Sequence, residues 1–248
     1  MSDGRMNEKD LERNELNENG IGGAEETAGE NAGKESALGK ISKSTYILTA
    51  IVCLLPVIAG VILYPRLPDS MAIHWGANGA PNGWAGKWVG AILLPGMLLV
   101  IQLLMPFLIK ADPKNKDLNP KVAGMIAWIM PAVSLICSSA TLMAGLGMNP
   151  NIQITAPLFV GFIALIIGNY LPKTTRSYTV GIKLPWTLNS EENWRRTHRL
   201  GGFLMALAGI CMIVSAFFPC RLVVFLAALG ISVITPIVYS YVLYRKGI

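Results

Sequence analysis

Charged side chains are scarce in this sequence and absent from six long stretches. Asp, Glu, Lys and Arg make up 15% of the 248 residues, whereas 52% of the residues are hydrophobic. The uncharged stretches are 44–63, 89–109, 122–146, 154–171, 200–218 and 222–244. Crossing the hydrocarbon core of a bilayer takes about 20 largely apolar residues. The sequence therefore predicts an all-α, polytopic membrane protein with six transmembrane helices.

Histidine and cysteine are also rare, which limits the chemistry available to the chain. His74 and His198 are the only histidines. Three of the four cysteines fall in apolar stretches, so no disulfide framework is expected. No Ser-His-Asp or Cys-His arrangement, no phosphate-binding glycine loop and no cluster of metal ligands is found. The apolar stretches lack the ionisable side chains that proton-coupled pumps place in the membrane. We expect no enzymatic activity, no metal and no cofactor.

The basic residues are distributed unequally between the predicted loops. With the amino terminus placed in the cytoplasm, fifteen Lys and Arg lie near helices on the inner side, and the outer side has only Arg66, Lys87 and Arg221. The positive-inside rule therefore predicts that both termini are cytoplasmic. The net charge of +6 reflects this topology first, and we expect no direct binding to nucleic acid.

The chain is predicted to have three parts. Residues 1–43 form an acidic segment without any aromatic side chain, which favours a disordered cytoplasmic tail, with a docking tail as the functional alternative. Residues 44–121 are expected to form a two-helix membrane module with an extracytoplasmic loop at 64–88. Residues 122–248 are expected to form a four-helix membrane module with a cytoplasmic loop at 172–199.

The outer loop reads YPRLPDSMAIHWGANGAPNGWAGKW and is rich in the turn-forming residues Gly, Pro and Asn. Trp75, Trp84 and Trp88 are placed to sit at the membrane interface. Two interpretations remain open at this point. The loop either packs on the mouth of the helix bundle as a compact cap, or it recognises an external ligand.

The longest polar tract between two apolar stretches covers residues 168–202 and reads GNYLPKTTRSYTVGIKLPWTLNSEENWRRTHRLGG. A connection this long is not a passive linker. Asn189 or Ser190 can cap a helix there. That helix would carry two favourable i,i+4 ion pairs, Glu191 with Arg195 and Glu192 with Arg196.

Helical spacing would place Trp194, Thr197, His198 and Gly201 on one face of this segment, with Arg195 and Arg199 on another. The pattern predicts an amphipathic segment on the inner membrane surface that leads into the fifth span. Its basic face could contact anionic lipid headgroups or dock a protein.

Two tracts together resemble one protein family. LPDSMAIHWGANGAPNGWAGK, residues 67–87, is similar to the amino-terminal domain of the SdpI family. GNYLPK at 168–173 and VGIKLPWTLNSEENWRRTHRLGG at 180–202 are similar to the SdpI signature itself. The resemblance covers roughly residues 45 to 245 and includes the order, spacing and number of spans. The acidic tail departs from the shorter family pattern.

The resemblance implies a multi-pass protein of the bacterial plasma membrane that protects the cell from a secreted, membrane-active peptide toxin. In toxin-producing systems such a protein also holds a cognate transcriptional repressor at the membrane. The expected partners are the lipid bilayer, a toxin outside and a repressor inside. The oligomeric state is not predicted.

Two sets of candidate site residues follow from this reading. The outer set would face the toxin and consists of His74, Trp75, Gly76, Pro81 and Trp84. The inner set would form the structural signature and any docking surface, and consists of Asn169, Tyr170, Pro172, Lys173, Pro185, Trp186, Trp194, Arg195, His198 and Arg199.

Two other functions remain open. Prolines in five of the six predicted helices suggest kinks, which could line the path of a transporter or channel for a small amphiphilic molecule. A weaker alternative is a membrane enzyme acting on lipid, with His198 and either Glu191 or Glu192 as acid–base groups.

Overall fold

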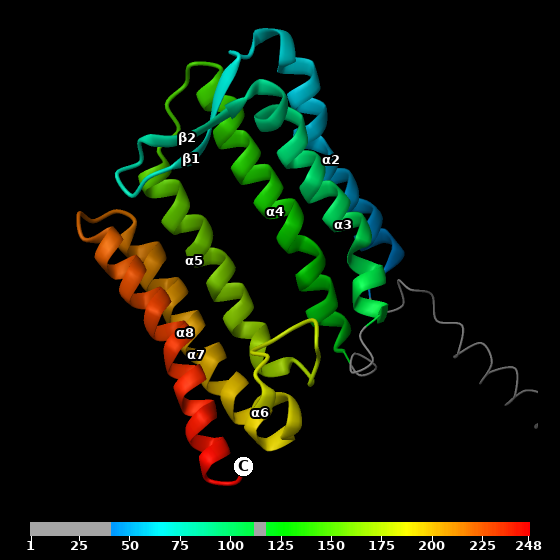
Figure 1. Ribbon diagram of the computed structural model, residues 1–248, viewed down its shortest axis with the longest axis vertical. Helices are drawn as coiled ribbons and strands as arrows, with labels where there is room; N and C mark the ends of the chain where they lie inside the picture. Colours follow the sequence, from blue (N-terminus) through cyan, green and yellow to red (C-terminus); the bar gives the residue numbers. More distant parts are fainter. Residues whose placement is uncertain (1–40, 112–117) are drawn as a thin grey trace, which may run out of the picture. The chain divides into compact units, whose positions relative to one another are not determined.

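The computed structural model describes residues 41–111 and 118–248. The predicted amino-terminal tail lies almost entirely outside the described residues, as do residues 112–117 of the connection between the second and third spans. Within the described parts, six helices are long and apolar enough to cross a membrane. They are α2 (Lys43–Leu63), α3 (Leu94–Ala111), α4 (Pro120–Gly145), α5 (Ile152–Tyr170), α7 (Glu191–Ser215) and α8 (Arg221–Arg245). The six-span, all-α prediction is confirmed (Figure 1).

Shorter elements connect these helices. A 3₁₀ turn, η1 (Tyr64–Arg66), extends α2, and a π-helical segment, η2 (Val89–Leu93), opens the second span. The 3₁₀ turn η4 (Leu171–Lys173) and the short helix α6 (Pro185–Asn189) lie in the tract between α5 and α7.

Polar caps fix where three of the long helices begin. Ser42 accepts a hydrogen bond from the amide of Thr45 at the start of α2, and Asn119 accepts one from the amide of Lys121 at the start of α4. Ser190 accepts one from the amide of Asn193 and caps α7. Ser190 is therefore the capping residue of the two predicted. The amphipathic segment and the fifth span form one continuous helix, which begins nine residues before the predicted apolar stretch.

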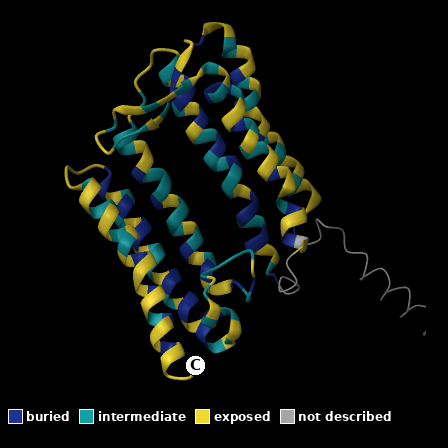
Figure 2. Ribbon diagram, viewed as in Figure 1, coloured by how far each residue is buried: buried dark blue, intermediate teal, exposed yellow. Residues whose placement is uncertain are grey.

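Large apolar side chains cover the outer faces of the helices. Ile62, Phe107 and Val223 are 69%, 62% and 70% exposed. Figure 2 shows such exposed residues along the length of α2 and α8. A water-soluble protein rarely exposes so much contiguous apolar surface. This pattern suits a protein whose helices are surrounded by lipid.

The long helices pack as two groups (Figure 1). α2, α3 and α4 contact one another, and α7 packs between α5 and α8. Contacts between α4 and α5 are few by comparison. The predicted boundary between a two-helix and a four-helix module, at residues 121 and 122, stays a prediction. In the structure, α4 packs mainly on α2 and α3, which belong to the predicted two-helix module.

A glycine seam joins α5 to α7. Gly161 and Gly168 on α5 face Gly209 and Gly202 on α7, and each pair on one helix is spaced by seven residues. A Cβ atom on Gly168 would lie 2.4 Å from the amide nitrogen of Ala206 and 2.7 Å from the carbonyl oxygen of Gly202. The two backbones can approach this closely only because the residues are glycines, as in other small-residue contacts between membrane helices.

The predicted outer loop contains an antiparallel hairpin of β1 (Ser70–Trp75) and β2 (Pro81–Gly86). Its register pairs Ser70 with Gly86 and Trp75 with Pro81, with irregularities on either side of His74. Met71 is fully buried against Leu142 of α4 and anchors the hairpin on the helices. The sequence predicted turns here but not strands, because Gly, Pro and Asn obscure the short alternating pattern of β1.

Candidate functional site

The predicted site residues lie at opposite ends of the helices. We call the end that carries β1 and β2 the hairpin end, and the end formed by residues 168–202 the signature end. The orientation of the two ends across the membrane stays a prediction based on the distribution of basic residues.

At the hairpin end, β1 closes an apolar cavity of about 380 Å³. Its lining includes Ile73, His74 and Trp75 from β1 and, from the helices, Leu98, Ile136 and Phe159. The cavity therefore lies where α3, α4 and α5 approach the hairpin. A volume of this size is within the range of small ligand sites, and an apolar lining with a few polar groups is typical of them.

His74 is held across the hairpin rather than by the helices. Its Nδ1 lies 2.6 Å from the side-chain oxygen of Asn82 on β2. At the base of the hairpin, the Lys87 ammonium lies 3.0 Å from the Asp69 carboxylate. This hydrogen bond and the negative charge of Asp69 raise the pKa of Lys87. These two pairs fix both ends of the strands on each other.

Gln153, which sequence reasoning missed, ties the hairpin to two helices. Its side-chain amide donates to the carbonyl oxygen of Asn78 at the hairpin turn, and Arg221 of α8 donates to its side-chain oxygen. A second cavity of about 180 Å³ lies beside these groups and is lined in part by Trp75 and Gly76. The available sequence signal for this contact was the position of Gln153, an amide side chain in the first turn of an otherwise largely apolar helix.

The structure thus divides the predicted outer set. His74, Trp75 and Gly76 line the cavities of the hairpin end. Pro81 and Trp84 belong to β2 and line neither of these two cavities, and Trp84 is 61% exposed.

At the signature end, Trp194 and His198 form a buried pair one turn apart on α7. Their rings stack with centroids 3.8 Å apart, and their exposed fractions are 3% and 1%. Trp194 Nε1 donates to the carbonyl oxygen of Thr174 at 2.9 Å. His198 Nε2 accepts from the amide of Ile182 at 2.9 Å, so the ring proton resides on Nδ1 and is donated to the Trp194 carbonyl at 2.8 Å.

Gly181 lets the chain pass directly over this pair. Its φ is +117°, in a region that residues with a Cβ rarely adopt. A Cβ atom there would also lie 2.5 Å from His198 Nε2 and 2.7 Å from Trp194. Glycine is therefore required both by the backbone conformation and by the space available.

A second network joins α6 and α7 to α8. Trp186 Nε1 donates to the hydroxyl of Ser240 at 2.9 Å, and the Trp186 ring stacks on Tyr244 with centroids 5.8 Å apart. The buried Asn193 amide donates to the carbonyl oxygens of Ser240 and Ile248. These bonds satisfy polar groups that would otherwise be buried without partners.

The predicted division of the α7 faces agrees with the burial of its residues. Trp194, Thr197 and His198 are buried, whereas Arg195 and Arg199 are exposed. One predicted ion pair is present, between Glu192 and Arg196 at 2.6 Å. The other is wrong, because Arg195 lies 2.6 Å from Glu192 and Glu191 pairs with Arg176 instead. The partner of Glu191 comes from the loop before α6, which local helical spacing cannot reveal.

The acid–base arrangement of the weaker alternative is not assembled. Both ring nitrogens of His198 are bonded to main-chain groups in a buried position. Glu191 and Glu192 are paired with arginines instead of approaching the ring. The contacts of His198 are therefore those of a residue that stabilises the fold.

Several predicted inner residues do share one accessible groove. It has a volume of about 490 Å³ between the signature-end parts of α5 and α7, and its lining includes Asn169, Tyr170, Pro172, Arg199 and Phe203. Lys173 and Pro185 are exposed and do not belong to its lining. The predicted inner set therefore separates into a buried core, which holds Trp194 and His198, and a polar-rimmed groove.

Comparisons with known proteins match two separate regions of the chain. Residues 173–240 match the SdpI/YfhL protein family, and residues 51–99 match a domain of unknown function, DUF1648. The chain is 28% identical over 207 residues to Immunity protein SdpI of Bacillus subtilis (strain 168), an alignment that covers 81% of this chain and 96% of that relative. No solved structure matches the chain. With its six apolar helices, this is a multi-pass protein of the bacterial plasma membrane, and over residues 173–240 it is similar to the SdpI/YfhL protein family.

Proposed function

We propose that this protein is a membrane immunity protein that protects its cell from a secreted, membrane-active peptide toxin, and that the hairpin end receives the toxin. The observation that carries the proposal is the apolar cavity of about 380 Å³ closed by His74 and Trp75. The name of the Bacillus subtilis relative, Immunity protein SdpI, supports the immunity role.

The chemistry of the cavity suits such a ligand. A membrane-active peptide presents apolar side chains beside polar groups, and the cavity offers an apolar interior formed by residues such as Leu98 and Phe159. Trp75 supplies a large apolar contact with a polar N–H. His74, held by Asn82, supplies a fixed polar group at the edge.

The test is a growth challenge with purified Sdp-type toxin in a sensitive strain that makes no toxin. Wild-type protein should permit growth, and Trp75→Ala should abolish most of this protection. Trp84→Ala is the matched control, because Trp84 is exposed on β2 and lies outside the cavity lining. Membrane levels of each variant are measured by immunoblot. Protection retained by Trp75→Ala, or lost only in Trp84→Ala, would overturn the assignment to the cavity.

We also propose that the groove between α5 and α7 docks a cytoplasmic repressor. Arg199 and Asn169 provide charged and polar groups at its rim, and Phe203, 66% exposed, provides an apolar contact. Arginine beside an exposed aromatic residue is typical of interaction surfaces. This role requires that the signature end is cytoplasmic, as the distribution of basic residues predicts.

A pull-down from membranes tests this docking role with two neighbouring arginines. Arg199→Ala should reduce recovery of the cognate repressor about tenfold, as expected for loss of an interface arginine worth more than 1 kcal/mol. Arg195→Ala should change it little, since Arg195 is paired with Glu192 and does not line the groove. Equal recovery with wild type and Arg199→Ala would contradict the proposal.

A passive path for a small amphiphile is a second candidate function, favoured by one observation. The cavity at the hairpin end reaches Ile136 of α4, and another cavity between α4 and α5 at the signature end reaches Ala132. These residues are one helical turn apart. Uptake of a fluorescent amphiphile by proteoliposomes, reduced by Ala132→Phe, would support transport. Absence of uptake with the wild-type protein would reject it.

A further inference from the structure

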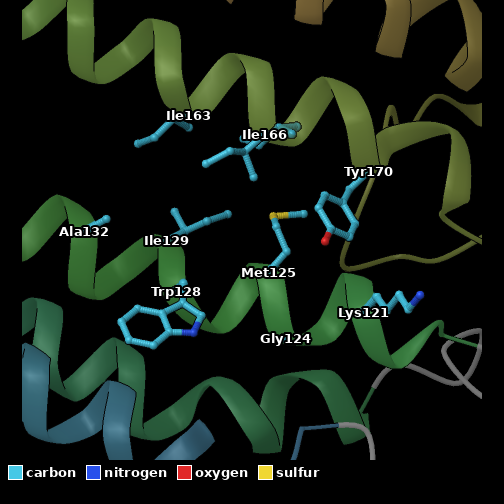
Figure 3. Close-up of a pocket in the computed structure, with 10 residues that line it drawn as sticks. Lys121, Gly124, Met125, Trp128, Ile129, Ala132, Ile163, Ile166 and Tyr170 are labelled. Atoms are coloured by element: carbon cyan, nitrogen blue, oxygen red, sulfur yellow. The ribbon is translucent and has the colours of Figure 1, made fainter.

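The cavity at the signature end lies between α4 and α5 and has a volume of about 580 Å³. Its interior is apolar and includes Met125, Ile129, Ile163 and Ile166 (Figure 3). The lining extends along residues 121–132 of α4, which corresponds to about 16 Å at the rise of an α-helix. That length is about half of the hydrocarbon thickness of a bilayer, or the depth of one leaflet.

Basic groups gather at one end of this cavity. Lys121 belongs to the lining, and the ammonium group of Lys173 lies 4.8 Å from the centre of the Tyr170 ring, which also lines the cavity. Figure 3 shows Lys121 and Tyr170 at the same end, with Ala132 and Ile163 at the other. The cavity is thus cationic where the membrane surface would lie and apolar toward the membrane interior.

The two lysines differ from the neighbouring arginines in their partners. In the described parts of the chain, Glu191 and Glu192 pair with Arg176, Arg195 and Arg196. The ion pairs there do not include Lys121 or Lys173. Among the residues that the structure describes, no carboxylate therefore offsets the charge of either ammonium group, and both can attract an anionic ligand.

We propose that this cavity binds one anionic phospholipid, with an acyl chain along Ile129 and Ile166 and the phosphate group beside Lys121 and Lys173. Charge complementarity selects the headgroup, and the length of the apolar lining matches a chain that spans one leaflet. Basic pockets between membrane helices bind anionic headgroups in this way. This site is separate from the toxin site of the proposed function and does not depend on it.

Native mass spectrometry of the full chain in detergent tests the site. Phosphatidylglycerol and phosphatidylcholine are added separately, and retained lipid is counted as mass adducts. We expect one phosphatidylglycerol per chain to survive gas-phase activation, and phosphatidylcholine to dissociate. Equal retention of both lipids, or retention of neither, would overturn the proposal. A dimer in place of the lipid adduct would assign the cavity to a second copy of the chain and overturn it equally.

Filling the cavity separates specific binding from lipid that merely surrounds the helices. Gly124 lines the cavity, and a Cβ atom there would meet no heavy atom within 4 Å, so Gly124→Leu adds bulk at the lining from an uncrowded backbone position. Gly230→Leu is the matched control, because Gly230 has equally open surroundings on α8 and does not line the cavity. Gly124→Leu should lose the phosphatidylglycerol adduct and Gly230→Leu should keep it. An adduct retained by both variants would contradict the site.

Removing the charges tests the selection of the headgroup. The double variant Lys121→Gln and Lys173→Gln should lower the affinity for phosphatidylglycerol roughly 25-fold, because each basic residue near an anionic headgroup contributes on the order of fivefold. Lys183→Gln, which removes an exposed lysine outside the lining, should leave the affinity unchanged. Unaltered binding by the double variant would show that these lysines do not hold the lipid.

Discussion

The hairpin end and the signature end use aromatic residues in opposite ways. At the signature end, Trp194 and His198 are almost completely buried and are bonded to main-chain groups of the preceding loop. At the hairpin end, Trp84 and Trp88 are 61% and 52% exposed, and Trp75 borders a cavity. The comparison teaches that the aromatic and polar residues of a distinctive tract, such as residues 168–202, can serve to pack and bond the tract itself. The surface available to a ligand can lie in the less regular loop.

The largest expected effect concerns which end faces outward. Cys220 is exposed at the start of α8, at the hairpin end, whereas Cys53 is buried within a membrane helix. Because Cys137 is also exposed and lines the cavity, the experiment uses a Cys137→Ser background. A membrane-impermeant maleimide applied to intact cells should label this protein and should fail to label it when Cys220→Ser is added. Labelling of Cys220 only after the cells are opened would reverse the two ends and remove the basis for toxin binding at the hairpin.

The next largest effect is expected at Gly181, which crosses the Trp194–His198 pair. Gly181→Ala should reduce the free energy of unfolding by about 2–5 kcal/mol, because steric overlap with His198 adds to an unfavourable backbone conformation. Thermal unfolding in detergent, followed by near-ultraviolet circular dichroism, measures the change.

Gly147→Ala provides the matched control for this backbone effect. Gly147 also has a positive φ, of +80°, but a Cβ atom there would meet nothing within 4 Å. We expect a cost of only about 1 kcal/mol from conformation alone. Equal destabilisation by both variants would show that the contact with the aromatic pair is unimportant.

A smaller effect is expected in the glycine seam. Gly168→Ala should separate α5 from α7 and lower the free energy of unfolding by about 1–3 kcal/mol, as for other overpacked interiors. Gly230→Ala, in open surroundings on α8, should be neutral or slightly stabilising since alanine favours helix. The same unfolding measurement applies, and a neutral result for Gly168→Ala would contradict the close approach of the two backbones.

The smallest single change in stability is expected at His74, in a comparison of the two histidines. His198→Ala leaves the amide of Ile182 without its acceptor and should destabilise the protein by about 1–3 kcal/mol. His74→Ala removes an exposed side chain and should change stability by less than about 0.5 kcal/mol, while it reduces protection from toxin. Stability losses of equal size would mean that the two ends do not divide structure from recognition.

The six spans could be predicted from the sequence because a bilayer core excludes charge, and each predicted span lies within a helix or differs from it by a few residues at the ends. The exception is α7, which begins nine residues before the predicted span. Its first turns are polar but helical, so the change from polar to apolar residues does not mark where the helix begins. The placement of Trp194 and Arg199 on different faces of α7 was also predictable, because helical spacing fixes which residues share a face.

Tertiary neighbours were beyond the reach of the sequence. Arg176 pairs with Glu191 from outside the helix, and Gln153 meets the hairpin turn from α5. Both contacts join residues in different segments, and helical or strand periodicity relates only residues within one segment. The cavities beside Trp75 and Lys121 likewise arise from how α4 and α5 are spaced, and no local pattern encodes that spacing.

The measurement that tests the division between the two ends most directly is the membrane potential of toxin-challenged cells. Cells that express Trp75→Ala should depolarise like cells without the protein, whereas cells that express Arg199→Ala at the same membrane level should keep their potential. The first variant alters the cavity at the hairpin end, and the second alters the groove at the signature end. A maintained potential with Trp75→Ala and a collapse with Arg199→Ala would contradict the account.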